Sequence, residues 1–298
     1  MSQQIETSRI IQFGQNILML SQQKASRLRN AVMMEPGIRG KRFSRDQVGS
    51  SSARRRTTRH GDTPLIETPH SRRWLTTVTY DWADLVDNID KLKNVEDPTN
   101  VYAQVGAAAM GRAMDDEIID AFFATAVTGE EAGSTVAFPA GQQIAVNSWA
   151  YGQGSGNVGL TISKLIEAKT LLDAAEAGTE PDEERYIAVT AKQVANLLAT
   201  TEVTSADYAS VKALVQGQID TFMGFKFIRT ERLDVDGSSY RRVPAWVKSG
   251  MCLGMVEDVV SRISERADKN YSTQVYAEMD IGATRMEEVK VVEIKCAE

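Results

Sequence analysis

The chain has 298 residues, of which 42% are hydrophobic and 25% are charged, and its formal net charge is −6 at pH 7. These values exclude a wholly disordered chain and suit one large domain or two smaller ones. Two cysteines and two histidines exclude a disulfide-stapled secreted domain and argue against a zinc site. No window of 18 apolar residues occurs, so we expect a soluble protein that is made and kept in the cytoplasm, with no membrane partner.

Residues 1–40 are predicted to form an N-terminal arm with a short helical or extended piece. The apolar residues of "SRIIQFGQNILML" include Ile10, Ile11 and Phe13, but Gly14 interrupts a helix. So few apolar side chains cannot hold a core alone. We therefore expect these three residues to contact another surface, from the same chain or from a neighbouring subunit.

The next segment, residues 41–73, is basic. It holds nine arginines and lysines against three carboxylates, a charge of +6, so the rest of the chain carries −12. An acidic body is a poor general nucleic-acid binder, because phosphate affinity comes mostly from arginine and lysine. The basic side chains stand among Ser and Thr rather than among aromatic residues, which favours docking on an acidic surface of a neighbouring copy. Binding of nucleic acid through this segment stays the alternative.

The same segment has the pattern of a two-stranded ribbon. Arginines, threonines and β-branched residues flank the turn-forming cluster "HGDTP", and "WLTTVTYDW" has high β propensity. We predict an extended loop, in the form of a β-ribbon, over residues 41–82. Because such a ribbon has little apolar face, it would be marginal alone and needs a partner on which to lie.

The strongest helix pattern of the chain runs from Asp97 to Gly129, "DPTNVYAQVGAAAMGRAMDDEIIDAFFATAVTG". Asp97 or Thr99 can cap its start, and Gly129 is predicted to close it. Small residues in its first half let another backbone approach closely. At ~1.5 Å per residue such a helix spans about 40 Å, which is long for a compact enzyme domain.

Helices and strands alternate after this helix without a regular βαβ rhythm. Residues 129–160 are rich in Gly and Ser and are predicted as a loop with one short strand. Helices are predicted in "TISKLIEAKTLLDAAEAG", "AKQVANLLAT" and "SADYASVKALVQGQ". Strands are predicted in "RYIAVT" and "TFMGFKFIRTERL" and then, as a mainly antiparallel sheet, in "WVKSGMCLGMV", "VVSRISERA", "STQVYAEMD" and "EEVKVVEIKC". The predicted fold class is therefore α+β.

The motifs that could carry chemistry are weak. "GQGSGNVG" lacks the preceding strand and the helix opening on it that a phosphate loop needs, so we predict a flexible loop. His60 and His70 lie beside turn residues and are predicted to be solvated rather than general bases. One helix face cannot supply the six or more oxygens of a hard cation, so a solvated acidic face is predicted for Asp115, Asp116, Glu117 and Asp120. We predict no enzyme, no catalytic residue, no cofactor and no metal.

The order of these features resembles that of tailed-bacteriophage major capsid proteins with the Hong Kong 97-like fold. The matching pieces are the arm, an extended loop ending in "SRRWLTTVTYDWADLVDNIDKLK", a spine helix "NVYAQVGAAAMGRAMDDEIIDAFFATA", the axial-domain phrase "VQGQIDTFMGFKFIRTERL" and return strands. The resemblance covers nearly the whole chain. It implies mixed and antiparallel sheets in peripheral and axial domains, with these boundaries: arm 1–40, extended loop 41–82, spine helix and first part of the peripheral domain 83–184, axial domain core 185–245, and axial-to-peripheral return strands 246–298.

The resemblance implies that the chain self-assembles into hexamers and pentamers of an icosahedral phage head that encloses double-stranded DNA. The protein would be located in the virion capsid and assembled in the bacterial host cytoplasm. Implied partners are other copies of the chain, a portal protein, a possible decoration protein, and packaged DNA held by weak non-specific contacts. Inter-subunit contacts are expected from the arm and the ribbon, at Ile10, Ile11, Phe13, Arg54, Arg55, Arg56, Arg59, Arg72, Arg73 and Trp74.

Two departures from the family pattern limit what the resemblance implies. Some members carry a long N-terminal scaffolding domain that is cleaved during maturation, whereas only about 95 residues precede the spine helix here. We therefore infer a separate scaffolding protein. Some members also form covalent cross-links between Lys and Asn. No acidic catalyst beside a matched pair can be identified, so no cross-link is predicted for Lys91, Lys93, Asn94 or Asn100.

Overall fold

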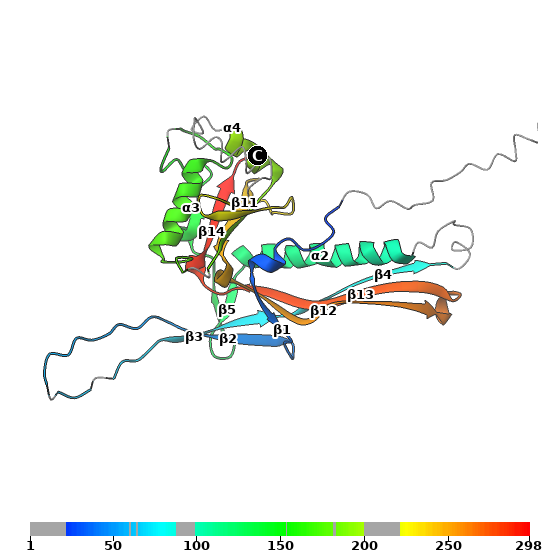
Figure 1. Cartoon of the computed structure of the whole chain (residues 1–298), viewed down its shortest axis with the longest axis horizontal. Helices are drawn as coiled ribbons and strands as arrows, with labels where there is room; N and C mark the ends of the chain where they lie inside the picture. Colours follow the sequence, from blue (N-terminus) through cyan, green and yellow to red (C-terminus); the bar gives the residue numbers. More distant parts are fainter. Residues whose placement is uncertain are drawn as a thin grey trace, which may run out of the picture. The chain divides into compact units, whose positions relative to one another are not determined.

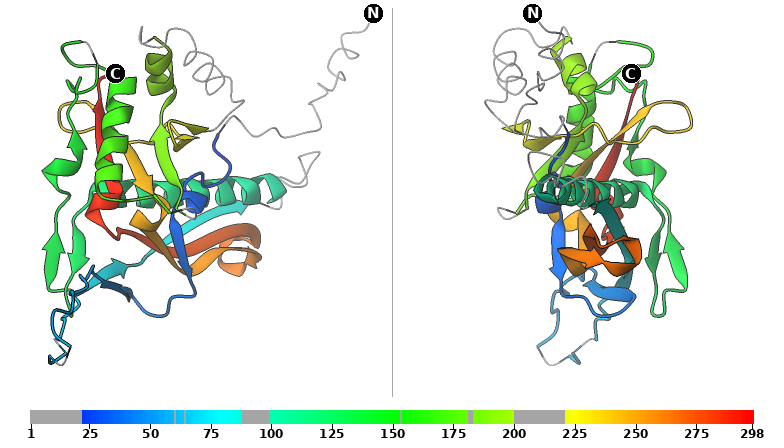
Figure 2. Two further views of the ribbon diagram at one scale, coloured as in Figure 1. Left: turned by 60° about the vertical axis from the view of Figure 1, so that its left-hand side comes forward. Right: turned by 90° about the vertical axis from the view of Figure 1, so that its right-hand side faces the viewer.

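The computed structural model describes residues 22–59, 61–63, 65–87, 99–152, 154–180, 183–199 and 221–298. Figures 1 and 2 show its helices and strands, coloured in chain order. The chain divides into two compact units. Among the described residues, the second unit contains everything outside four pieces that form the first unit, 22–25, 80–87, 99–112 and 259–279. The helix predicted in "SADYASVKALVQGQ" lies outside the described residues.

The second unit contains a six-stranded mixed sheet with the order β7-β14-β11-β8-β10-β9. β8 pairs in parallel with β10 and antiparallel with β11, which in turn pairs antiparallel with β14. Every residue of β8 is buried, which explains its continuous pattern "RYIAV" and confirms the strand predicted there. The strands are β7 (Gln143–Ile144), β8 (Arg185–Val189), β9 (Thr221–Phe222), β10 (Phe225–Arg229), β11 (Arg241–Val247) and β14 (Val291–Cys296).

Two helices of the second unit begin at threonine residues whose side chain or amide takes part in capping. α3 (Ile162–Ala174) follows Thr161, whose hydroxyl accepts a backbone N–H of the first turn at 3.4 Å. α4 (Ala191–Ala199) follows Thr190, whose amide donates to Gln193 Oε1 at 2.8 Å, as in one half of a capping box. α3 contacts β7 and β14, and Figure 2 shows it beside β14, so this helix covers one part of the sheet.

A four-stranded sheet has the order β1-β12-β13-β4, and its two long central strands run through both units. β1 pairs in parallel with the start of β12. The prediction of two separate strands in "WVKSGMCLGMV" and "VVSRISERA" is wrong, because β12 runs without a break through most of both stretches. The break lies earlier, at the 3₁₀ turn Lys248–Gly250, which separates β12 from β11. The strands are β1 (Met33–Pro36), β4 (Val78–Val86), β12 (Met251–Arg266) and β13 (Ser272–Arg285).

The third sheet, of order β2-β3-β5-β6, lies in the second unit. All of its strand pairs are antiparallel. The ribbon β2–β3 therefore gains its partner from the same chain, through the pairing of β3 with β5. The strands are β2 (Arg42–Val48), β3 (His70–Thr76), β5 (Ala126–Thr128) and β6 (Ser134–Val136).

α2 (Thr99–Phe123) is the long helix that the sequence predicts, and it ends earlier than predicted. The predicted end at Gly129 is wrong, because β5 follows the helix and Gly129, with a φ of 95°, lies in the turn between β5 and β6. Val127 and Thr128 suit a strand better than a helix, and their pairing with β3 overrides the helical pattern.

The acidic residues of α2 do not form a solvated face as predicted. Asp115 is 0% exposed and accepts hydrogen bonds from residues just before β1. Asp116 forms an ion pair with Arg232. These carboxylates therefore attach the helix to other parts of the second unit.

The core of the second unit is centred on Trp246, which is 0% exposed. Its ring centroid lies 4.6 Å from that of Phe122 and 5.9 Å from that of Tyr186, and its indole N–H donates to the carbonyl of Ala31 at 2.8 Å.

The two cysteines are buried free thiols. Among the described residues, no helix is both long and apolar enough to cross a membrane.

Glu298 supports a prediction about pH. Its carboxylate accepts from Arg241 at 2.8 and 2.9 Å and from Gln193 Nε2 at 2.7 Å, and the bonds from Arg241 are the main cause of a pKa of about 2. Because this pKa lies below the ordinary value of 4.5, the ionised group stabilises the fold above about pH 4.5 and loses that effect as pH falls towards 2.

We expect Glu298→Gln to remove this acid-sensitive part of the stability, on the order of 2 kcal/mol. The measurement is thermal unfolding of both proteins at several pH values between neutral and pH 2. The melting temperatures should differ near neutrality and converge in acid. A constant difference at every pH would contradict the assignment.

Candidate functional site

The basic segment forms a ribbon that ends in a long unpaired loop. β2 and β3 pair up to Val48 and His70, and the amide of Gly49 then donates to the carbonyl of Pro69 at 2.8 Å. β2 and β3 form a two-stranded ribbon, as predicted, but residues 78–82 of the predicted ribbon belong to β4 in another sheet. The paired strands also stop far from the "HGDTP" turn, since the Gly, Ser and Pro residues between them favour strands poorly. We call residues 49–69 the tip loop.

The tip loop exposes its charge and two large apolar side chains. Arg54, Arg55 and Arg56 line an open hollow of about 280 Å³, together with Thr57, Thr58, Gly61, Asp62 and Thr63. Arg56 Nε donates to the carbonyl of Thr58 at 2.8 Å. Within the described part of the chain, no carboxylate pairs with the tip-loop arginines, and Leu65 is 90% exposed. The loop therefore presents cations and apolar surface to solvent.

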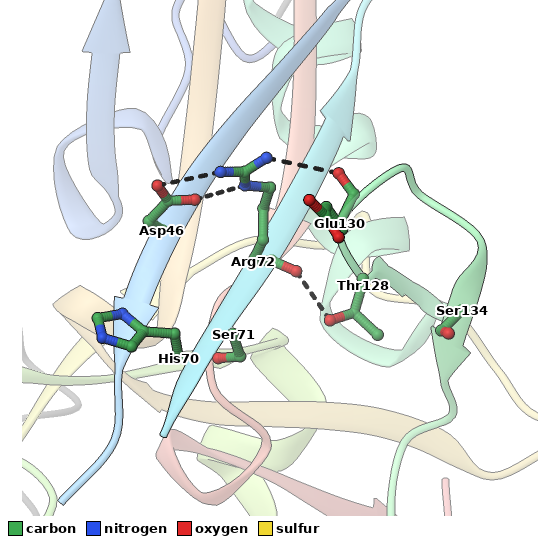
Figure 3. A pocket seen from close by; sticks show the side chains of 8 residues that line it. Asp46, His70, Ser71, Arg72, Thr128, Glu130 and Ser134 are labelled. Atoms are coloured by element: carbon green, nitrogen blue, oxygen red, sulfur yellow. Dashed lines mark hydrogen bonds and ion pairs between the residues drawn. The ribbon is translucent and has the colours of Figure 1, made fainter. Parts of the chain in front are cut away.

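A second pocket, of about 500 Å³, lies at the base of the ribbon (Figure 3). Arg72 crosses it from β3 and binds Asp46 on β2, directly opposite in the strand register, with an Nη2–Oδ2 distance of 3.2 Å. The hydrogen bond from Arg72 lowers the pKa of Asp46. Thr128 Oγ1 donates to the carbonyl of Arg72 at 2.8 Å, and exposed His70 also lines the pocket. Side-chain hydrogen bonds thus join β3 to β2 and to β5 at the base of the ribbon.

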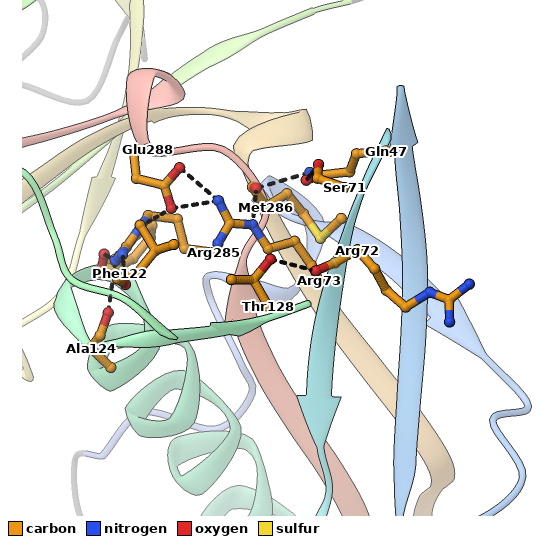
Figure 4. A network of polar contacts seen from close by, with 11 residues as sticks. Gln47, Ser71, Arg72, Arg73, Phe122, Ala124, Thr128, Arg285, Met286 and Glu288 are labelled. Atoms are coloured by element: carbon orange, nitrogen blue, oxygen red, sulfur yellow. Dashed lines mark hydrogen bonds and ion pairs between the residues drawn. The ribbon is translucent and has the colours of Figure 1, made fainter. Parts of the chain in front are cut away.

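Arg73 points to the other side of β3, into a buried polar network (Figure 4). It is 8% exposed, and its Nη2 donates to both carboxylate oxygens of Glu288 at 2.7 Å. Its Nε donates to the carbonyl of Met286 at 2.9 Å. A bidentate, charge-assisted contact of this kind fixes the position of both partners, so Arg73 holds β3 on the segment that follows β13.

The same carboxylate faces a second buried cation. Arg285 Nε lies 3.7 Å from Glu288, and Arg285 is 1% exposed. Its Nη1 donates to the carbonyls of Phe122 and Ala124 at 2.7 and 2.9 Å, at the C-terminal end of α2, where a cation is favourable. Burial lowers the pKa of Arg285 from its ordinary value. One carboxylate therefore links the ribbon to the end of the long helix.

The ribbon also packs closely on the sheet that contains β12 and β13. Leu75 of β3 is 2% exposed. A side chain at Gly254 or Gly282 would meet Leu75, and a Cβ atom at Gly282 would lie 2.3 Å from the carbonyl oxygen of Thr76. Trp74 Nε1 donates to the carbonyl of Gly129 at 2.7 Å. Glycine at position 282 permits this approach, which no other residue allows.

The sequence-predicted contact residues thus occupy two environments. Arg54, Arg55, Arg56 and Arg59 are exposed on the tip loop, whereas Arg72, Arg73 and Trp74 bind groups of their own chain. Ile10, Ile11 and Phe13 lie outside the described residues. Sequence reasoning missed Arg285 and Glu288, because the sequence gives no signal that these distant residues meet Arg73. Among the described residues, no group of three or more His, Cys, Asp or Glu could hold a metal ion.

The shared carboxylate yields a stability prediction. Glu288→Gln leaves two buried guanidiniums without their anion, and we expect the free energy of unfolding to fall by about 3 kcal/mol. The matched control is Glu287→Gln, since Glu287 is 46% exposed and pairs with Lys290 at 3.4 Å; its effect should stay below about 1 kcal/mol. Urea denaturation of both variants is the measurement, and equal midpoints would contradict the role of Glu288.

The comparisons with known proteins agree on one family. The model of the phage capsid protein family matches residues 5–298. No curated protein matches the chain. Similar solved structures include the capsid of cyanophage P-SCSP1u, with a TM-score of 0.74 at 14% identity, over 99% of this chain and 94% of that one. The capsid of Ralstonia phage GP4 has a TM-score of 0.72 at 10% identity, with coverages of 97% and 95%. The head structure of Helicobacter pylori bacteriophage KHP40 has a TM-score of 0.70 at 9% identity, over 96% of this chain and 95% of that one.

These structures share the Hong Kong 97-like α+β fold with this chain over nearly its full length. The alternative of a dedicated nucleic-acid-binding protein has no support among them. The chain belongs to the phage capsid protein family, as a major capsid protein of the phage virion.

Proposed function

We propose that this chain builds the hexamers and pentamers of an icosahedral phage head that encloses double-stranded DNA. The observation that carries the proposal is the family match over residues 5–298, joined to a ribbon whose tip loop has exposed arginines that pair with no described carboxylate. A long basic loop held rigidly at its base and free at its tip is suited to reach an acidic neighbour. The domain boundaries expected from the sequence belong to this proposal.

The tip loop is the part that contacts the neighbouring copy. Arg54, Arg55, Arg56 and Arg59 bind carboxylates there, and Leu65 adds apolar contact. Arg72, Arg73 and Trp74 act by holding the ribbon base in place. Each exposed ion pair contributes only about 0–1 kcal/mol, but the contact recurs at every subunit of a shell. On the arm, Ile10, Ile11 and Phe13 supply apolar contacts to neighbouring subunits.

The remaining partners follow from the same assignment. A separate scaffolding protein directs assembly in the bacterial host cytoplasm, and a portal protein and a possible decoration protein join the head. The acidic body touches packaged DNA only by weak, non-specific contacts, because like charges repel. The chain acts structurally and not as an enzyme.

The experiment that tests the proposal is negative-stain electron microscopy of the purified full chain, with sedimentation velocity to measure its mass. Ring-shaped capsomers, closed particles or very large assemblies are the expected result. A small, compact monomer at every concentration tried, with the tip loop protected from proteases, would contradict it. A small species that binds DNA steeply with falling salt would instead support the nucleic-acid alternative.

Charge reversal tests the tip loop itself. We expect the triple variant Arg54→Glu, Arg55→Glu, Arg56→Glu to lose at least about tenfold in particle yield, because three attractive contacts become repulsive. The fold should stay intact, since these side chains are exposed on an unpaired loop.

The matched control replaces the same three arginines with lysine, which keeps the charge. Its particle yield should stay near that of the unaltered chain. Far-ultraviolet circular dichroism and melting temperature check the fold of both variants. Normal particles from the glutamate variant would remove the docking role of the tip loop.

A further inference from the structure

Residues 26–28, which lie inside the predicted arm 1–40, are held by one buried carboxylate of α2. Asp115 accepts from Ser26 Oγ at 2.6 Å and from the amides of Arg27 and Leu28 at 3.0–3.1 Å. Asp115 is 0% exposed, and so is Leu28. A buried carboxylate that accepts two backbone N–H groups forms charge-assisted hydrogen bonds, which are stronger than neutral ones. These bonds fix residues 26–28 to α2, and we call Asp115 together with these residues the anchor.

The anchored segment is ordered by further bonds on both sides of the carboxylate. Ser26 Oγ accepts from the amide of Arg29, the first residue of the 3₁₀ turn Arg29–Ala31, at 3.1 Å. The guanidinium of Arg29 binds Asp258 with N–O distances of 2.6 and 3.1 Å. Ser26 thus serves both the turn and Asp115, so the anchor and the turn form together.

α2 also holds the residues just before the anchor. Arg112 Nη1 donates to Gln22 Oε1 at 2.8 Å and to the carbonyl of Gln23 at 3.0 Å. Arg112 and Asp115 are three positions apart, a spacing that places two side chains on the same face of a helix. Two charged residues on one face of α2 therefore bind consecutive parts of the chain: Arg112 binds residues 22–23, and Asp115 binds residues 26–28.

The anchor lies within reach of the expected contact residues of the arm. Phe13 precedes Gln22 by nine residues, a length of chain that spans at most about 30 Å when extended. An arm that leaves a fixed point can deliver its apolar side chains only inside that radius. The position of the anchor on α2 therefore limits which surface of a neighbouring copy the arm can meet.

We propose that Asp115 is a positioning residue for assembly, which fixes the point where the arm leaves α2 so that residues 1–21 meet a second copy of this chain. The inference rests on the proposed shell function. Asp115 acts through Ser26, Arg27 and Leu28. Its role differs from a contribution to folding, because its effect depends on the presence of the arm.

The test compares particle yield for the unaltered full chain, Asp115→Asn, a deletion of residues 1–21, and the two changes combined. Asparagine keeps the size of aspartate but loses the charge and half of the acceptors, so we expect about a tenfold loss of yield. The combined variant should assemble no worse than the deletion alone, because an absent arm needs no positioning. The matched control is Asp116→Asn, which removes the partly exposed pair with Arg232 and should leave the yield unchanged.

Hydrogen exchange of the unassembled subunits supplies the second measurement. Asp115→Asn should speed exchange at the amides of Arg27 and Leu28 and leave the buried strand β8 unchanged. If the unaltered chain forms particles and Asp115→Asn does so equally well, the positioning role is overturned and the shell function stands. If the losses from the two changes multiply, Asp115 serves folding alone and the role is also overturned. If the unaltered chain forms no assemblies, the proposed function fails first.

Discussion

The carboxylate of Glu288 lies between two buried guanidiniums, and the attachment of the ribbon to its own chain depends on it. Arg73 comes from β3, while Arg285 ends β13 and binds the last carbonyls of α2. Two buried cations without an anion would be strongly unfavourable, so the three groups exist only as a set. Ribbon, long helix and return strands are therefore joined at one polar cluster, which hydrophobic packing of Leu75 against glycines reinforces.

This internal attachment divides the basic segment into a base and a tip with different tasks. At the base, Arg72 forms an ion pair with Asp46, and Arg73 forms one with Glu288. At the tip, no described carboxylate of the chain neutralises the arginines, and the loop makes no strand pairs. Sequence position alone predicts one environment for all of these arginines, whereas the structure shows two.

Local patterns predicted much of the fold, and long-range partners could not be predicted. The apolar run of β8, the helix α3 and most of α2 follow from neighbouring residues, so the sequence reveals them. The strand β5 was missed because its pairing with β3 outweighs a helical pattern. Asp115 was expected in solvent because its partners lie almost ninety positions earlier in the chain. Of the site, the exposed tip was predictable from composition, while the Arg285–Glu288 cluster was not.

The charge balance is compatible with the proposed docking between copies, despite the ion pairs inside the chain. An ion pair removes one charge of each sign, so pairs inside the body leave its surplus unchanged. Only two ion pairs join the basic segment to the described body, Arg45 with Glu35 and Arg73 with Glu288. Setting those two aside, residues 41–73 keep +4 of their +6 and the remainder keeps −10 of its −12. A loop that no described carboxylate of its own chain neutralises is suited to the proposed docking on the acidic surface of another copy.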